Sequence, residues 1–157
     1  MKRFPALILA SLAAAALVRG LREMGDFEIS VSAYPERHPE SESEAVDLDM
    51  LKQKVDAGAT RALTQFFFDN DHYFRYLDRV RKAGIGIEIV PGILPVQNFR
   101  TAASFATRCG TDVPGWLAKR FEGLDDEARS VTLVTAALEG EAGIHRCRFE
   151  GLGSLLS

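Results

Sequence analysis

The residues of this sequence that could do chemistry gather in one short segment. Residues 34–40 read YPERHPE and place an aromatic ring, carboxylates, a guanidinium and an imidazole around two prolines. The prolines restrict the backbone, so a loop of this kind can present fixed polar groups to a cofactor. The same residues also suit an ordinary solvated connection with turn prolines, and the sequence alone leaves both interpretations open.

A second candidate residue is Gln65, whose amide interrupts the apolar segment 62–68, ALTQFFF. Burying an unpaired amide costs roughly 1–3 kcal/mol, so we expect Gln65 to have a hydrogen-bond partner in a ligand or in the protein. From the pattern alone, an internal bond to a neighbouring strand is the commoner outcome. The phenylalanines are most simply core residues: Phe66, Phe67, Phe68 and Phe105.

Asp47 and Lys54 form a third candidate pair. They are seven residues apart on one predicted helix and therefore share roughly one face. There an acid could accept hydroxyl groups and a cation could meet phosphates. The alternative is a solvated helix face, which is the usual place for such charges.

The elements that must position these residues alternate between strands and helices. The apolar patterns predict strands at 27–34, 62–68 and 86–94, the middle one buried on both faces. Capping and stop signals predict helices between and after them, with starts at Ser41 and Glu44, Asp69–Asp71, Asn98, Pro114, and Asp125 with Asp126. Repeated strand–helix units predict an α/β fold with a parallel sheet and right-handed crossovers.

Two architectures use such units, a doubly wound sheet and a barrel. Neither G-x-G-x-x-G nor a P-loop follows any predicted strand, which disfavours a nucleotide-binding doubly wound sheet. In a barrel the chemistry lies where the strands end, at residues 34–40, 65–69 and 91–98. The 157 residues fall short of the roughly 250 that a complete (β/α)8 barrel uses, so in the barrel interpretation the chain would form only part of a barrel.

Composition excludes several classes of function. The net charge of −3 and the absence of any Lys/Arg cluster argue against nucleic-acid binding. Cys109 and Cys147 are far apart, and the three histidines are isolated from one another, so we expect no disulfide and no metal site.

The first 18 residues allow two interpretations. A short basic start followed by an Ala/Leu-rich run has the general form of a secretory signal peptide, which would make the chain an exported α/β binding protein. The run is too short to span a membrane. The apolar stripe continues through Arg19 and Arg22 to Met24 without a break, which favours one packed helix over export.

Four segments in order resemble the carboxyl-terminal half of the catalytic barrel of bacterial-type methylenetetrahydrofolate reductase: DFEISVSAYPERHPES (26–41), KVDAGATRALTQFFFD (54–69), EIVPGILPVQNF (88–99) and FEGLDD (121–126). The resemblance covers residues 14–138 and leaves 139–157 as a divergent tail. It implies one partial (β/α)8 TIM-barrel domain over residues 1–157.

The resemblance also implies an activity. Members of the family are cytoplasmic flavoproteins that use FAD and NAD(P)H to reduce 5,10-methylenetetrahydrofolate to 5-methyltetrahydrofolate. The reaction belongs to one-carbon metabolism and methionine biosynthesis. Its partners are therefore the folate and the nicotinamide, with no nucleic acid and no membrane, and homo-oligomerisation stays open. The family's general-acid glutamate has no counterpart here, so no catalytic residue is assigned, and we expect activity to be impaired by truncation. A non-catalytic remnant or partner-dependent interaction module is the alternative.

Matching motif positions assigns the binding residues. The resemblance implies FAD contacts from Tyr34, His38, Asp47 and Lys54, with Ser32 and Ser41 as weaker candidates. It implies folate or nicotinamide contacts from Gln65, Phe105 and Thr101, although Thr101 stands where the family pattern has glutamine. Gln65 would bond the pterin, which is the ligand partner that its position calls for.

Overall fold

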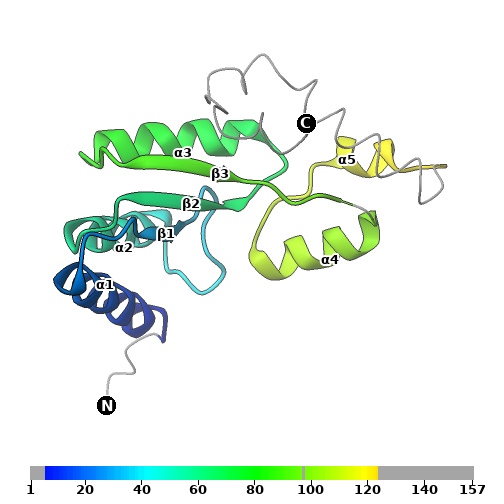
Figure 1. The fold of residues 1–157 in the computed structure, drawn as a ribbon. Helices are drawn as coiled ribbons and strands as arrows, with labels where there is room; N and C mark the ends of the chain where they lie inside the picture. The colour runs from blue at the N-terminus through cyan, green and yellow to red at the C-terminus, as the bar shows by residue number, and fades with distance from the viewer. Residues whose placement is uncertain (1–5, 97, 124–157) are drawn as a thin grey trace, which may run out of the picture. The chain divides into compact units, whose positions relative to one another are not determined.

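The structure, a computed structural model, describes residues 6–96 and 98–123, with side chains from residue 13 onward. Its elements are shown in Figure 1. In chain order they are α1 (Ala6–Met24), β1 (Ser30–Ala33), α2 (Glu44–Asp56), β2 (Arg61–Phe66), α3 (Asn70–Lys82), β3 (Glu88–Gly92), α4 (Phe99–Cys109) and α5 (Gly115–Arg120).

These elements fall into two compact units. The first contains the described residues of Met1–Leu94 and Phe105–Val113, and the second contains those of Pro95–Ser104 and Pro114–Ser157. The first unit holds the sheet. In the second unit the Phe99 and Phe121 rings stack with their centroids 5.4 Å apart.

The sheet of the first unit is parallel, with the strand order β1-β2-β3. Ser30 pairs with Arg61, and Arg61 pairs in turn with Glu88. Each strand is followed by a helix before the next parallel strand begins, as Figure 1 shows. The predicted strand–helix alternation and parallel sheet are therefore confirmed, and the described strands form an open sheet, consistent with a partial barrel.

An irregularity at the end of β2 depends on a glycine. The pairing of β2 with β3 shifts register between Leu63 and Phe66. There the N–H of Gly92 donates to Thr64 Oγ1 at 2.9 Å, and a Cβ on Gly92 would lie 2.1 Å from the Thr64 carbonyl oxygen. Only glycine allows the two backbones to approach this closely, and the shift occurs beside Gln65.

One prediction about β2 is wrong. The strand was expected to be buried on both faces, but Leu63 is 46% exposed while Ala62, Thr64 and Phe66 are buried. Side chains alternate between the two faces of a strand, so Leu63 and Gln65 share the face that is not packed against the core. The strands are also shorter than their apolar patterns suggest, at 30–33, 61–66 and 88–92.

The helix starts test the capping predictions. Asp69 caps α3 by accepting from the N–H of Asp71 at 2.9 Å, and Asn98 accepts from the N–H of Thr101 at 3.0 Å, so both predictions are confirmed. The capping box at Ser41 is wrong, because the extended residue before α2 is Ser43, whose Oγ accepts from Val46 N. Pro114 is the N-cap of α5. The helix predicted from Asp125 and Asp126 lies outside the described residues.

The predicted continuous helix at the amino terminus is confirmed as α1. Ala15 and Val18 of this helix are buried in one apolar cluster with Ile29, Ala57 and Ala59. The guanidinium of Arg22 donates to the carbonyl of Gly58 at 2.9 Å and fixes α1 to the turn before β2. Within the described part of the chain, no helix combines the length and the apolar character needed to cross a membrane.

Candidate functional site

A cleft of about 600 Å³ lies in the first unit at the carboxyl ends of β1 and β2. We call it the strand-end cleft. The sheet contributes Ser32 and Gln65, the loop after β1 contributes Tyr34 and His38, and the end of α4 contributes Arg108. The structure thus gathers four of the predicted site residues, namely Ser32, Tyr34, His38 and Gln65, at the sheet edge where the barrel interpretation placed the chemistry.

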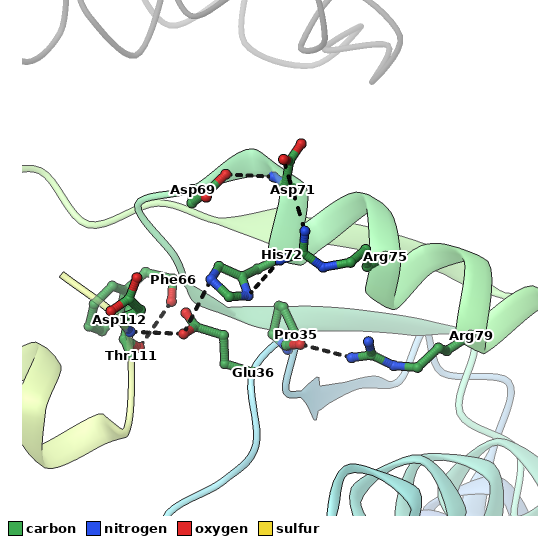
Figure 2. Close-up of polar contacts among 10 residues, drawn as sticks. All are labelled: Pro35, Glu36, Phe66, Asp69, Asp71, His72, Arg75, Arg79, Thr111 and Asp112. Carbon is green, nitrogen blue, oxygen red and sulfur yellow. Dashed lines mark hydrogen bonds and ion pairs between the residues drawn. The ribbon is translucent and has the colours of Figure 1, made fainter. Parts of the chain in front are cut away.

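The YPERHPE loop, residues 34–40, is held by contacts from three other segments. Arg79 of α3 donates to the carbonyl of Pro35 at 3.0 Å, as Figure 2 shows. The backbone N–H of His38 donates to Asp47 Oδ2 of α2 at 3.0 Å. Gly110, with φ +72°, packs against the loop so closely that a Cβ would lie 2.9 Å from Pro39 Cγ. The loop is therefore anchored rather than a free solvated connection.

Tyr34 and His38 form an aromatic pair on this loop. Their ring centroids are 4.8 Å apart in an edge-on arrangement. The N–H of Glu40 donates to His38 Nδ1 at 3.2 Å, so a neutral His38 imidazole carries its hydrogen on Nε2. Both residues line the strand-end cleft.

Asp47 and Lys54 lie on one buried face of α2. Both side chains are buried, so the alternative of a solvated helix face is wrong. The ammonium of Lys54 donates to the carbonyl oxygen of Ser32 at 2.7 Å and lies 3.3 Å from its hydroxyl. Burial lowers the pKa of Lys54, and the negative charge of Asp47 opposes that shift. Asp47 Oδ1 is buried and has no hydrogen-bond partner.

Ser32 and Ser41 have different surroundings. Ser32 lines the strand-end cleft, and through its carbonyl it links Lys54 to the cleft. Ser41 is buried, and its hydroxyl donates to the carbonyl of Ser43 at 3.0 Å. The carbonyl of Ser41 accepts from Arg37. Ser41 therefore fixes the end of the loop, while Ser32 faces the space that a ligand could fill.

Gln65 lines the cleft with a partly buried side chain. Among the described residues its amide makes no hydrogen bond, so the expectation of a bond to a neighbouring strand is wrong. A half-buried amide without a protein partner is a ready donor and acceptor for a bound molecule.

Phe105 and Thr101 lie on α4, in different units. Phe105 is 40% exposed and stacks on Phe66 with centroids 5.5 Å apart, so the prediction that it is a simple core residue is wrong. The guanidinium of Arg108 sits 5.6 Å from the Phe105 ring centroid. Thr101 belongs to the second unit, where its N–H is held by Asn98. It is not among the residues that line the cleft.

Two residues of the site, Arg108 and Cys109, were not predicted from the sequence. Arg108 and Cys109 line the cleft, and Arg108 could have been found from its position three residues after Phe105 on one helix. Glu36, in the middle of the loop, bonds the backbone N–H of Asp112. No local signal links those two residues. No group of three or more metal-ligating side chains occurs within the described ranges.

Comparison with known proteins places these residues in a family context. The family model described as methylenetetrahydrofolate reductase matches residues 9–147. The 5,10-methylenetetrahydrofolate reductase of Escherichia coli K12 is 56% identical over 120 residues, which are 76% of this chain and 40% of that protein. The Salmonella typhimurium LT2 protein of the same name is 55% identical over 123 residues, 78% of this chain and 42% of that protein.

A plant relative also matches. The protein named methylenetetrahydrofolate reductase (NADH) 1 of Arabidopsis thaliana is 38% identical over 126 residues, which are 73% of this chain and 21% of that protein. The chain therefore spans about 40% of the length of the bacterial relatives and about a fifth of the plant relative.

Proposed function

Because the chain belongs to the methylenetetrahydrofolate reductase family, whose fold is a TIM barrel, we propose that its strand-end cleft is part of a flavin and folate site. The reaction it serves is the reduction of 5,10-methylenetetrahydrofolate to 5-methyltetrahydrofolate in the cytoplasm. FAD is the cofactor and NAD(P)H the electron donor. The printed name of the plant relative specifies NADH for that protein.

One observation carries the proposal. The amide of Gln65 is partly buried in the cleft without a bond to any described residue, beside Tyr34 and His38. A pterin edge carries alternating donors and acceptors, and a carboxamide can pair with one of each. Because the amide is open to the cleft and makes no bond to a described residue, it is free to pair with such a ligand, which supports folate as the molecule that Gln65 binds.

The residues around the loop fit a flavin dinucleotide. The cleft volume of about 600 Å³ lies within the range of cofactor sites. The buried, unpaired Asp47 Oδ1 is an acceptor for a hydroxyl group, and the nearby ammonium of Lys54 carries the charge that favours a phosphate. When bound, the flavin supplies hydride transfer, which no amino-acid side chain provides.

The chain's own residues then bind and orient. Tyr34 offers a ring for packing, and His38 Nε2 donates a hydrogen bond at the rim of the cleft. Ser32 contributes its hydroxyl, and Phe105 offers an exposed ring surface to a second aromatic molecule. Thr101 stays a proposed folate contact. These groups position ligands, and none of them is assigned as a proton donor.

The test separates binding from turnover. The full chain is titrated with FAD, followed by flavin fluorescence, and then with 5-methyltetrahydrofolate. We expect it to bind FAD weakly and to show background rates in NADH–menadione and methylenetetrahydrofolate assays. Replacement Gln65→Leu should weaken folate binding about tenfold and leave FAD binding unchanged. The matched control is Thr60→Val, which removes a polar group from the other end of the sheet, where its hydroxyl contacts Ile29.

Each outcome is informative. If the wild-type chain binds neither FAD nor folate, the proposal is contradicted and a non-catalytic interaction module is favoured. Equal folate affinity of the wild type and Gln65→Leu contradicts the role of Gln65. Robust turnover contradicts the expectation that the chain is impaired on its own.

A further inference from the structure

Glu36, on the YPERHPE loop, holds a carboxylate in an unusual setting. Its side chain is 14% exposed. Oε2 accepts from the backbone N–H of Asp112 at 2.8 Å and lies 3.9 Å from His72 Nε2, as Figure 2 shows. Oε1 is buried without a hydrogen-bond partner. Neither the composition nor the proposed ligand contacts explain why an acid occupies this position.

His72 presents a donor to this carboxylate. Arg75 Nη2 lies 3.3 Å from His72 Nδ1, and a guanidinium can only donate, so Nδ1 is the acceptor. The imidazole hydrogen therefore sits on Nε2, the atom nearest to Glu36. The other charged groups around Glu36 are Asp69 and the Asp112 carboxylate, with Arg37 and Glu44 lining the same small cavity.

Because it is buried, the Glu36 carboxylate lowers the stability of the fold at neutral pH. Desolvation raises the pKa of Glu36 above its ordinary value of 4.5, although the bond from Asp112 N and the proximity of His72 act in the opposite direction. A carboxyl group with a raised pKa in the folded state stabilises the fold when it is protonated. That contribution is lost as the pH rises through the folded pKa, so ionised Glu36 is retained at the expense of stability.

The contacts of Glu36 connect two parts of the strand-end cleft, namely the YPERHPE loop and the end of β2. On one side the residue belongs to the loop that carries Tyr34 and His38. On the other side its partner Asp112 follows Thr111, whose hydroxyl donates to the carbonyl of Phe66 at 3.3 Å. Phe66 follows Gln65 directly in β2. A short path of polar contacts therefore runs from the loop to the strand end that bears Gln65.

We propose that Glu36 is a positioning residue of the cleft, whose carboxylate fixes the YPERHPE loop to the Asp112 backbone and so sets Tyr34 and His38 relative to Gln65. The identity of the ligand rests on the proposed function, but the positioning does not. A charged acceptor binds an N–H more strongly than a neutral one, so the contact is strongest when Glu36 is ionised. Loop order and fold stability therefore respond to pH in opposite directions.

The experiment compares the full chain with three variants. Glu36→Leu removes the acceptor, Glu36→Gln keeps an acceptor without charge, and Glu42→Leu is the matched control, because Glu42 is exposed. Amide hydrogen exchange is measured at His38 and Asp112, with amides of β2 as the internal reference. FAD affinity and the urea midpoint of unfolding are measured on the same samples.

For Glu36→Leu we expect exchange at His38 and Asp112 about tenfold faster, FAD affinity about tenfold weaker, and an unfolding midpoint that is unchanged or higher. In Glu36→Gln, the exchange rates and the FAD affinity should return to within about threefold of the wild-type values at pH 7. In the wild type, lowering the pH should reduce the protection of the Asp112 amide, measured as its exchange rate relative to the intrinsic rate at the same pH, and this dependence should be absent in Glu36→Gln. Glu42→Leu should match the wild type.

Three results would overturn the proposal. The first is unchanged exchange at His38 and Asp112 in Glu36→Leu. The second is an equal acceleration at β2, which would indicate general destabilisation. The third is a loss of affinity in Glu42→Leu as large as in Glu36→Leu. Faster exchange confined to the loop in a chain that binds no FAD would support the positioning role and count against the proposed function instead.

Discussion

The two ends of the parallel sheet are held in different ways. At the amino ends of β1 and β2, the small apolar residues Ala15, Val18, Ile29, Ala57 and Ala59 form one buried cluster. At the carboxyl ends, the YPERHPE loop is held by three hydrogen bonds. Arg79 donates to the loop carbonyl of Pro35, the N–H of His38 donates to Asp47, and the N–H of Asp112 donates to Glu36. Among the described residues, the two buried side-chain oxygens that lack a hydrogen-bond partner are Glu36 Oε1 and Asp47 Oδ1, and both belong to this second set of contacts.

This difference separates stability from function. Apolar packing is stabilising without directional requirements, whereas buried charges are costly unless they are fully paired. In barrel folds the amino ends of strands serve stability and the carboxyl ends serve catalysis. We therefore expect substitutions at the amino ends to unfold the chain, and substitutions at the carboxyl ends to alter binding more than stability.

The largest effect is expected from Val18→Asp in the apolar cluster. Val18 is buried, and placing an unpaired carboxylate there should lower the free energy of unfolding by about 3 kcal/mol or more. Urea unfolding followed by circular dichroism measures the loss. The control is Leu17→Asp, because Leu17 is the adjacent residue of α1 and is 64% exposed. Similar midpoints for the two variants would show that α1 does not contribute to the core.

A smaller effect is expected from Gly110→Ala at the carboxyl end. The residue has φ +72°, and its new Cβ would lie 2.9 Å from Pro39 Cγ and 3.2 Å from the carbonyl oxygen of Arg37. The control is Gly84→Ala, where φ is +76° but no atom lies within 4 Å. Gly84→Ala measures the backbone cost alone, about 1 kcal/mol.

Gly110→Ala should lower the free energy of unfolding by about 1 kcal/mol more than the control, because the loop must also shift. It should also weaken FAD binding, which Gly84→Ala should not. Equal stabilities and equal affinities would show that the loop is not held against Gly110.

Local signals in the sequence predicted the framework of the molecule. The strand–helix alternation and the caps at Asp69 and Asn98 depend on residues close together in the chain, and the structure confirms them. The start of α2 was misplaced by two residues, because Ser41 and Ser43 are both good cap residues. The extended backbone at Ser43 and the hydrogen bond from Val46 N to its Oγ distinguish the two residues.

The contacts that hold the site depend on residues far apart in the chain. Glu36 and Asp112 are 76 positions apart, and Arg79 and Pro35 are 44 apart, so no local pattern predicts either bond. The exposure of Leu63 could not be predicted from an apolar run either, because it depends on what covers the second face of the sheet. The cofactor and folate roles of Tyr34, His38, Asp47, Lys54 and Gln65 stay predictions from family resemblance.

The smallest effect is a pH dependence at Lys54, which tests whether the carboxyl end tolerates costly charge. Burial lowers the pKa of Lys54 in the folded protein below its ordinary value of 10.5. Above the folded pKa and below 10.5, the unfolded chain binds a proton that the folded chain does not, so stability contributed by this group rises with pH. In Lys54→Met that rise should be absent.

The measurement is the free energy of unfolding from pH 7 to pH 10 for the wild type, Lys54→Met and the control Lys52→Met. Lys52 is exposed and pairs with Asp56 at 3.0 Å within α2, so its removal should leave the pH dependence unchanged. The difference between the wild type and Lys54→Met should therefore shift in favour of the wild type as the pH rises. A constant difference would mean that the Lys54 ammonium is fully compensated by Asp47 and Ser32. The carboxyl end would then be as well satisfied as the apolar cluster at the other end of the sheet.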